Sequence, residues 1–290
     1  MKLGYVSSIV KHDVLVKPEI NLGDYVKEIA SIGYDGCGVF SCRGQAGYPG
    51  YLSVKDRREL RKLMHDLGCD VAGIGAYGGM MLTTEFAYLV DEPERRYAVD
   101  FMKKSVDLAV DLDCEVVEDL AGVKPEGMSE KKAWGSLCAC VKEICKYADD
   151  RGVFLAVEHL GLVDTPAKFL ELADAVGSEA LKCVYDPSNM FKYLGQGKKE
   201  ILEGVHLNGD YIADVHLKGV SRDLEFVRPC SEADYYGQRE FLEALKKVGY
   251  RGSVLVEEYE QFYVPSTAEE PFLAARIAYR DVRKMLEVLK

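Results

Sequence analysis

The sequence predicts a single (β/α)8 barrel that spans residues 1–290. Two observations carry this prediction: eight short apolar runs alternate with helical patterns, and no linker, low-complexity run or charge block divides the chain. The length of 290 residues agrees with it, because a barrel typically needs about 250 residues. A doubly wound open sheet is the alternative, but no Gly-rich phosphate loop follows the first apolar run.

The apolar runs are the candidate strands. Each is rich in Val, Ile, Leu or aromatic residues and is short enough to be a strand buried on both faces. They span residues 2–8, 36–41, 70–77, 114–121, 153–160, 181–186, 212–219 and 253–259. Parallel strands need a crossover connection, usually a helix, so eight such units in succession favour a closed barrel.

Helical patterns, with apolar residues three and four positions apart, fill the intervals. They span residues 24–33, 54–68, 93–112, 129–152, 165–177, 239–250 and 271–290. Gly33 is the stop signal of the first pattern, and Ser129 is an N-cap without a capping box, because Lys132 stands where Glu would be needed. Thr165 is a second N-cap, with Pro166 at the first helical position.

The composition limits the classes of partner that the protein can bind. A net charge of −11 argues against a nucleic-acid partner, since phosphate binding depends on Lys and Arg. No apolar run has the length of a membrane helix, and the N-terminal residues do not resemble a signal peptide. We therefore expect a cytoplasmic protein with a small-molecule substrate, with its nine cysteines as thiols that are mostly buried. The oligomeric state stays open, with a homodimer or homotetramer among the options.

Four consecutive predicted strands end in polar side chains of the kind that bind metals. These are Glu158, Asp186, His216 and Glu257, separated by 28, 30 and 41 residues, each about one βα unit. The C-terminal strand ends of a barrel form its active site, so the four should converge there. Glu258 is the alternative to Glu257, because a slip of one residue turns a strand side chain to the other face.

Three carboxylates and one imidazole make a hard, mainly oxygen site. One such residue alone is usually a cap or an ion-pair partner, but four together would be costly to bury without a cation. This donor set suits Mn²⁺, Mg²⁺ or Co²⁺ and leaves positions open for substrate oxygens. We expect Mn²⁺, with Mg²⁺, Co²⁺ or Zn²⁺ as alternatives.

The chain also resembles a known family, the xylose-isomerase-like TIM barrels or sugar phosphate isomerase/epimerases. The resemblance lies mainly in residues 150–260 and rests on the Glu in LAVEHLG, on DPSN, on HLKG and on GYRGSVLVEE. It implies that Glu158, Asp186, His216 and Glu257 are metal ligands. It also implies that the two glutamates act as acid and base on opposite faces of a carbohydrate substrate.

Two further residues are judged against the ketose 3-epimerases of this family. Arg222 stands six residues after His216, where those epimerases place an arginine near the metal and substrate. Asn189 stands where they have a histidine, three residues after Asp186, and an amide does not exchange protons at neutral pH. Both are candidate substrate-binding residues.

The chemistry that this site implies is metal-dependent isomerisation or epimerisation of a sugar-like ketone through a cis-enediolate. A dehydratase or lyase that uses the same enolate is the alternative, as in inosose dehydratase or C-glycoside deglycosidases. It needs an acid near the leaving group, and the candidates are His159, Lys218, Glu118 and His12. Strand alternation points His159 away from Glu158, whereas Lys218 should share the side of His216.

Two other functional classes are alternatives. Endonuclease IV, a relative within the family, uses a trinuclear site with several more histidines, and this chain has five histidines and a strongly acidic balance. A barrel that has lost activity and serves as a sugar-binding subunit is the non-enzymatic alternative. Retention of all four expected ligands argues against it.

Overall fold

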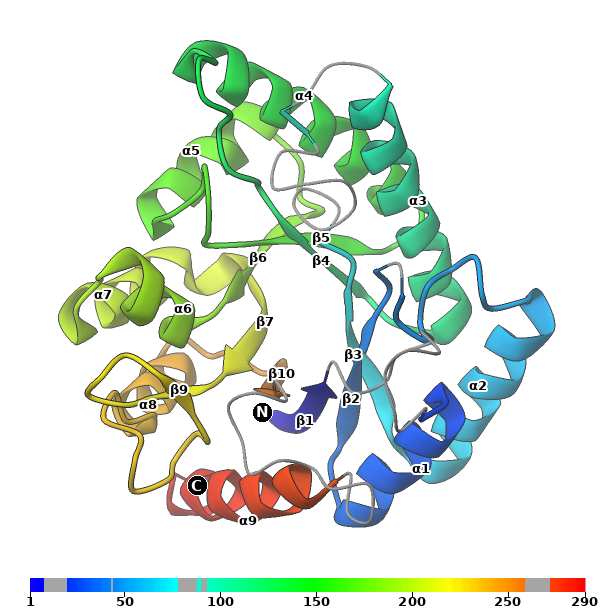
Figure 1. Ribbon diagram of the computed structural model, residues 1–290, viewed down its shortest axis with the longest axis vertical. Helices are drawn as coiled ribbons and strands as arrows, with labels where there is room; N and C mark the ends of the chain where they lie inside the picture. Colours follow the sequence, from blue (N-terminus) through cyan, green and yellow to red (C-terminus); the bar gives the residue numbers. More distant parts are fainter. Residues whose placement is uncertain (8–19, 43, 78–87, 90–92, 259–271, 290) are drawn as a thin grey trace.

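The computed structural model describes residues 1–7, 20–42, 44–77, 88–89, 93–258 and 272–289. Its central feature is a closed parallel barrel in the order β1-β10-β7-β6-β5-β4-β3-β2, surrounded by helices (Figure 1). The first and last strands of the barrel close it, in a register that runs from Lys2 opposite Ser253 to Ser7 opposite Glu258. The predicted single (β/α)8 barrel is therefore confirmed.

Each predicted apolar run contains one barrel strand. The strands are β1 (Lys2–Ser7), β2 (Gly36–Phe40), β3 (Asp70–Gly75), β4 (Val116–Leu120), β5 (Phe154–Glu158), β6 (Leu181–Tyr185), β7 (Ile212–Leu217) and β10 (Ser253–Glu258). A small antiparallel hairpin of β8 (Gly219–Val220) and β9 (Phe226–Val227) follows β7 and was not predicted. Its first strand starts two residues beyond the end of β7, so it extends the chain just past His216 and Lys218.

The helices cover the outside of the barrel. They are α1 (Leu22–Ile32), α2 (Val54–Leu67), α3 (Glu94–Leu112), α4 (Glu130–Asp149), α5 (Pro166–Val176), α6 (Pro187–Leu194), α7 (Lys198–Asn208), α8 (Arg239–Lys247) and α9 (Leu273–Val288). None of these described helices is long and apolar enough to cross a membrane.

Local signals explain most helix ends. Gly33 ends α1 in the left-handed conformation, with φ of 107°. The Ser129 side chain accepts a hydrogen bond from the backbone N–H of Lys132, and Thr165 caps α5 in the same way. Helices α6 and α7 were missed, because each is short and the break at Gly195 interrupts the apolar periodicity.

The main core fills the layer between the barrel and the helices. Tyr185 of β6 stacks on Phe241 of α8, with ring centroids 5.8 Å apart, and Phe169 of α5 packs edge-on against Tyr211. Seven of the nine cysteines are buried, as expected of small apolar side chains. This packed layer fixes the strand ends, on which the polar side chains of the site are carried.

Candidate metal centre

The four expected ligands lie at the C-terminal ends of four strands that are adjacent in the barrel. Glu158 is the last residue of β5, Asp186 directly follows β6, His216 lies in β7 and Glu257 lies in β10. All four are almost fully buried, with exposed fractions of 3% or less. The strand order β5-β6-β7-β10 therefore collects them on one side of the barrel.

Asp186 owes its orientation to the local sequence that follows it. It is the N-cap of α6, and its Oδ1 accepts hydrogen bonds from the backbone N–H groups of Ser188 and Asn189, each at 2.9 Å. Pro187 occupies the first helical position, where no N–H is needed. With Oδ1 held by the helix, Oδ2 remains available to a cation.

Asp186, His216 and Glu257 form what we call the cation group. Each offers one ligand atom, and these atoms all lie within 4.8 Å of one another. Nδ1 of His216 is 3.1 Å from Oε2 of Glu257. Neither ring nitrogen of His216 has a partner in hydrogen-bond geometry among the described residues, although the ring is fully buried. A buried donor atom in this situation fits a metal ligand.

Lys218 places a positive charge at the same point. Its ammonium group contacts Oδ2 of Asp186 and Oε2 of Glu257, and the side chain is 1% exposed. The backbone carbonyl of Lys218 accepts hydrogen bonds from the Ser188 hydroxyl and from the amide of Gln238, so the main chain is fixed. A divalent ion that binds these two oxygens must compete with the ammonium for them.

The electrostatic surroundings shift the pKa values of the two glutamates of the site in opposite directions. Burial and the charge of Asp186 raise the pKa of Glu158 to about 7, against the opposing effects of Lys218 and His216. Burial also acts to raise the pKa of Glu257, but Lys218 and His216 outweigh it and hold that pKa well below its usual range. Near neutral pH, Glu158 therefore exchanges a proton readily, whereas Glu257 stays ionised.

Asn189 supports Glu158 directly. Its Nδ2 donates a 2.6 Å hydrogen bond to Oε1 of Glu158, and its own backbone N–H is held by Asp186. Glu158 is not part of the three-residue cation group, but it lies beside it through this link. Asn189, expected to bind substrate, thus fixes one glutamate oxygen and leaves the other available.

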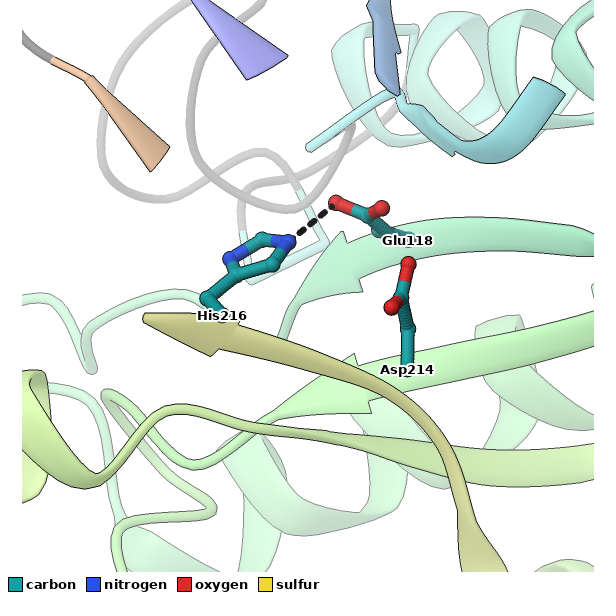
Figure 2. A group of neighbouring side chains, drawn as sticks. All are labelled: Glu118, Asp214 and His216. Carbon is teal, nitrogen blue, oxygen red and sulfur yellow. Dashed lines mark ion pairs between the residues drawn. The ribbon is translucent and has the colours of Figure 1, made fainter. Parts of the chain in front are cut away.

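A second set of side chains lies on the opposite side of the His216 ring. Glu118 of β4 and Asp214 of β7 face His216 (Figure 2), and Oε2 of Glu118 is 3.2 Å from Nε2 of His216. The hydroxyl of Tyr77 donates a 2.8 Å hydrogen bond to the same Glu118 oxygen. We call Tyr77, Glu118 and Asp214 the support group.

The sequence interpretation missed Asp214 and the role of Tyr77. Asp214 stands two residues before His216, so strand alternation, which was applied to Lys218, also predicts that it faces the barrel interior. Tyr77 has no comparable signal, because it follows β3 in the left-handed conformation with φ of 50°.

One expected substrate-binding residue, His159, points away from the site. His159 turns into the layer between barrel and helices, where Nδ1 donates to the carbonyl of Val184 and Nε2 accepts from Asn208. This follows from alternation, because its neighbour Glu158 takes the inner face. Arg222 is exposed after β8, with its guanidinium 5.1 Å from the ring centroid of Tyr235. His12 lies outside the described residues.

The residues present fit a hard divalent cation. The cation group offers two carboxylates and one imidazole, and its surroundings add the carboxylates of Glu158 and Glu118. One ammonium group does not neutralise so many buried acids. Three of the four expected ligands lie together in the cation group, and Glu257 lies beside His216.

Several solved structures share this fold along their whole length. A D-tagatose 3-epimerase-like protein superposes with a TM-score of 0.77 at 22% identity, covering 99% of this chain and 98% of that one. D-psicose 3-epimerase from Clostridium cellulolyticum H10 gives 0.70 at 18% identity, covering 99% and 94%. A 3-keto-D-glucoside 4-epimerase from E. coli gives 0.73 at 15% identity, covering 98% and 99%.

Sequence comparison assigns the family. A search among curated proteins finds no match. The family model described as the xylose isomerase-like TIM barrel matches residues 26–280, which include every barrel strand except β1. The resemblance noted in the strand-end motifs thus extends over most of the chain, and the protein belongs to the xylose isomerase-like TIM barrel family.

Proposed function

We propose that this protein is a metal-dependent isomerase or epimerase of a sugar or sugar-like ketone, with Glu158 and Glu257 as acid and base. The observation that carries the proposal is the convergence of two buried glutamates, Glu257 within the cation group and Glu158 beside it, whose electrostatic environments are opposite. Environments that push apart the pKa values of two carboxyls are typical of acid–base pairs. The sugar epimerases among the similar structures support the substrate class.

Asp186, His216 and Glu257 would hold the metal, with Glu158 as the fourth ligand. When bound, a divalent ion there supplies Lewis acidity that makes the C–H beside a carbonyl more acidic. Mn²⁺ is the ion that we propose, because oxygen donors dominate the set.

The protein's own groups carry the proton. Glu257 is ionised, so it can accept the proton from the carbon next to the carbonyl, which gives a cis-enediolate. Glu158, with a pKa of about 7, returns a proton to the opposite face in epimerisation or to the neighbouring carbon in isomerisation. The amide of Asn189 keeps Glu158 in place during both events. In the reverse reaction, the two glutamates exchange roles.

The test is deuterium wash-in at the α-carbon, with Mn²⁺-loaded protein and a panel of ketohexoses, inososes and 3-keto-glycosides. We expect the wild type to exchange deuterium into at least one of these substrates. Glu158→Gln and Glu257→Gln keep the side-chain size but remove the proton-transfer group. Each should lower the exchange rate by about 10²–10⁴-fold, the usual contribution of general acid–base catalysis.

The control is Glu115→Gln, which makes the same chemical change at an exposed position just before β4. It should exchange at the wild-type rate. Wild-type rates in both active-site variants would contradict the acid–base assignment. A wild type that binds Mn²⁺ but exchanges none of the panel would favour a sugar-binding subunit instead.

Elimination from the same enolate is a second candidate function, and Lys218 favours it. Its buried ammonium lies against Glu257, where it can protonate a departing hydroxyl or carbon leaving group. The same exchange experiment separates the two functions through its products. Isomers of the substrate that carry deuterium in place of the exchanged hydrogen indicate epimerisation or isomerisation. Products that have lost water or an aglycone indicate a dehydratase or lyase.

A further inference from the structure

We infer that Glu118 is a positioning residue, which holds the His216 ring so that Nδ1 points toward the cation group. This inference rests on the proposed metal function and gives Glu118 a different role from the leaving-group acid for which the sequence made it a candidate.

One oxygen of Glu118 contacts two groups at once. Oε2 lies 3.2 Å from Nε2 of His216 and accepts a 2.8 Å hydrogen bond from the Tyr77 hydroxyl. Glu118 and His216 are 2% and 0% exposed, respectively, so water does not weaken their attraction. Nδ1, on the other side of the ring, is the nitrogen that faces Glu257 of the cation group, 3.1 Å from its Oε2.

The backbone holds Tyr77 on Glu118. Tyr77 adopts the left-handed conformation, which a non-glycine residue keeps only where its surroundings enforce it. The enforcing contacts come from the same glutamate: the backbone N–H groups of Ala76 and Tyr77 both donate to the Glu118 carbonyl, at 3.1 and 3.2 Å. Tyr77 therefore contacts Glu118 through both main chain and side chain.

A glycine of β3, Gly73, leaves room for the Glu118 carboxylate. A Cβ atom added at Gly73 would lie 2.1 Å from Oε1 of Glu118 and 2.6 Å from Oδ2 of Asp214. Only glycine leaves room for the two acids to approach each other there. Asp214 is itself fixed, because its Oδ1 accepts a 2.7 Å hydrogen bond from the N–H of Val215. Glu118 thus lies against Gly73, Asp214 and Tyr77, and its Oε2 faces His216.

Confinement of this kind matters for a metal-binding histidine. A carboxylate on the second ring nitrogen fixes which nitrogen carries the proton, orients the ring and makes the other nitrogen a better ligand. Loss of such a partner typically costs about 10–100-fold in metal affinity or activity. Since Oε2 of Glu118 lies against both Nε2 of His216 and the Tyr77 hydroxyl, we infer that Glu118 acts through His216.

The experiment measures metal affinity and ring geometry separately. Mn²⁺ binding is titrated calorimetrically, and the ring nitrogens of His216 are followed by ¹⁵N–¹H correlation spectra of metal-free and Zn²⁺-loaded protein. Glu118→Gln should weaken Mn²⁺ binding by about 10–100-fold and shift the Nε2 resonance in the metal-free protein. Tyr77→Phe retains Glu118 and removes one hydrogen bond, so it should weaken binding by a smaller factor, in the same direction.

Glu115→Gln is the matched control and should leave both measurements unchanged. Wild-type Mn²⁺ affinity together with an unshifted Nε2 resonance in a folded Glu118→Gln protein would overturn the inference. If the wild type binds no divalent ion, the proposed function fails, but the metal-free spectra still decide the role of Glu118. A variant that does not fold is replaced in this comparison by Tyr77→Phe, for which an unchanged Nε2 resonance and unchanged affinity would count against the inference.

Discussion

Two histidines of this barrel are equally buried and have opposite environments. His159 is 1% exposed and lies among Phe169, Tyr185 and Asn208, where burial lowers its pKa to about 4 despite the hydrogen bond to the Val184 carbonyl. His216 is fully buried as well, but the carboxylates of Glu118 and Glu257 outweigh the effect of burial and raise its pKa well above the usual value.

The comparison shows that burial alone does not identify a functional histidine. His159 satisfies both ring nitrogens with neutral partners, which is how a structural histidine is accommodated in a core. His216 is instead placed between acids on two sides and finds no aligned hydrogen bond among the described residues. Around His216 the inner face of the barrel collects carboxylates, whereas the hydrogen-bond partners of His159 in the outer layer are neutral.

The largest effect is expected when Lys218, in the charged surroundings of His216, is replaced. Lys218→Met leaves Asp186 and Glu257 without their ammonium partner, and breaking a buried ion pair typically costs about 3–5 kcal/mol of stability. We expect a large fall in melting temperature without metal. Mn²⁺ should restore stability and bind more tightly than to the wild type, because the competing cation is gone. Equal Mn²⁺ affinity in both proteins would show that Lys218 and the ion do not share a position.

Acid should destabilise the protein through His159, whose surroundings are neutral. The folded pKa of His159, about 4, lies below its value of about 6.5 in the unfolded chain. The unfolded state therefore binds more protons in acid, so the contribution of His159 is fully present above pH 6.5 and is lost as the pH falls toward 4. A shift of this size corresponds to about 3 kcal/mol.

Urea unfolding of the wild type and of His159→Asn, measured between pH 7.5 and 4, isolates this effect from other titrating groups. The stability difference between the two proteins should narrow, or change sign, as the pH falls. A difference independent of pH would mean that the environment of His159 does not depress its pKa.

Most of the fold could be predicted from the sequence, because strands buried on both faces and amphipathic helices leave separate patterns. Each predicted apolar run contains a barrel strand, whereas α6 and α7 were missed because Gly195 divides a region too short for clear periodicity. The four strand-end residues could be identified for the same reason, since barrel topology brings C-terminal strand ends together.

The contacts of the support group with His216 could not be predicted in the same way. Glu118 of β4 reaches His216 of β7 across the barrel interior, and these two strands are not neighbours in the sheet. Their contact depends on barrel closure and on the missing side chain at Gly73. Lys218 was placed on the right side by alternation, but its ion pairs with two expected ligands depend on side-chain geometry that a sequence does not specify.

The most direct test of the central claim is a Mn²⁺ titration of the wild type, His216→Asn and His159→Asn, followed by the electron paramagnetic resonance signal of free Mn²⁺. The account predicts one tightly bound ion per wild-type chain, binding at least about 100-fold weaker in His216→Asn, and nearly wild-type affinity in His159→Asn, since that residue lies outside the barrel interior. Equal affinity in wild type and His216→Asn, or no bound Mn²⁺ in the wild type, would contradict it.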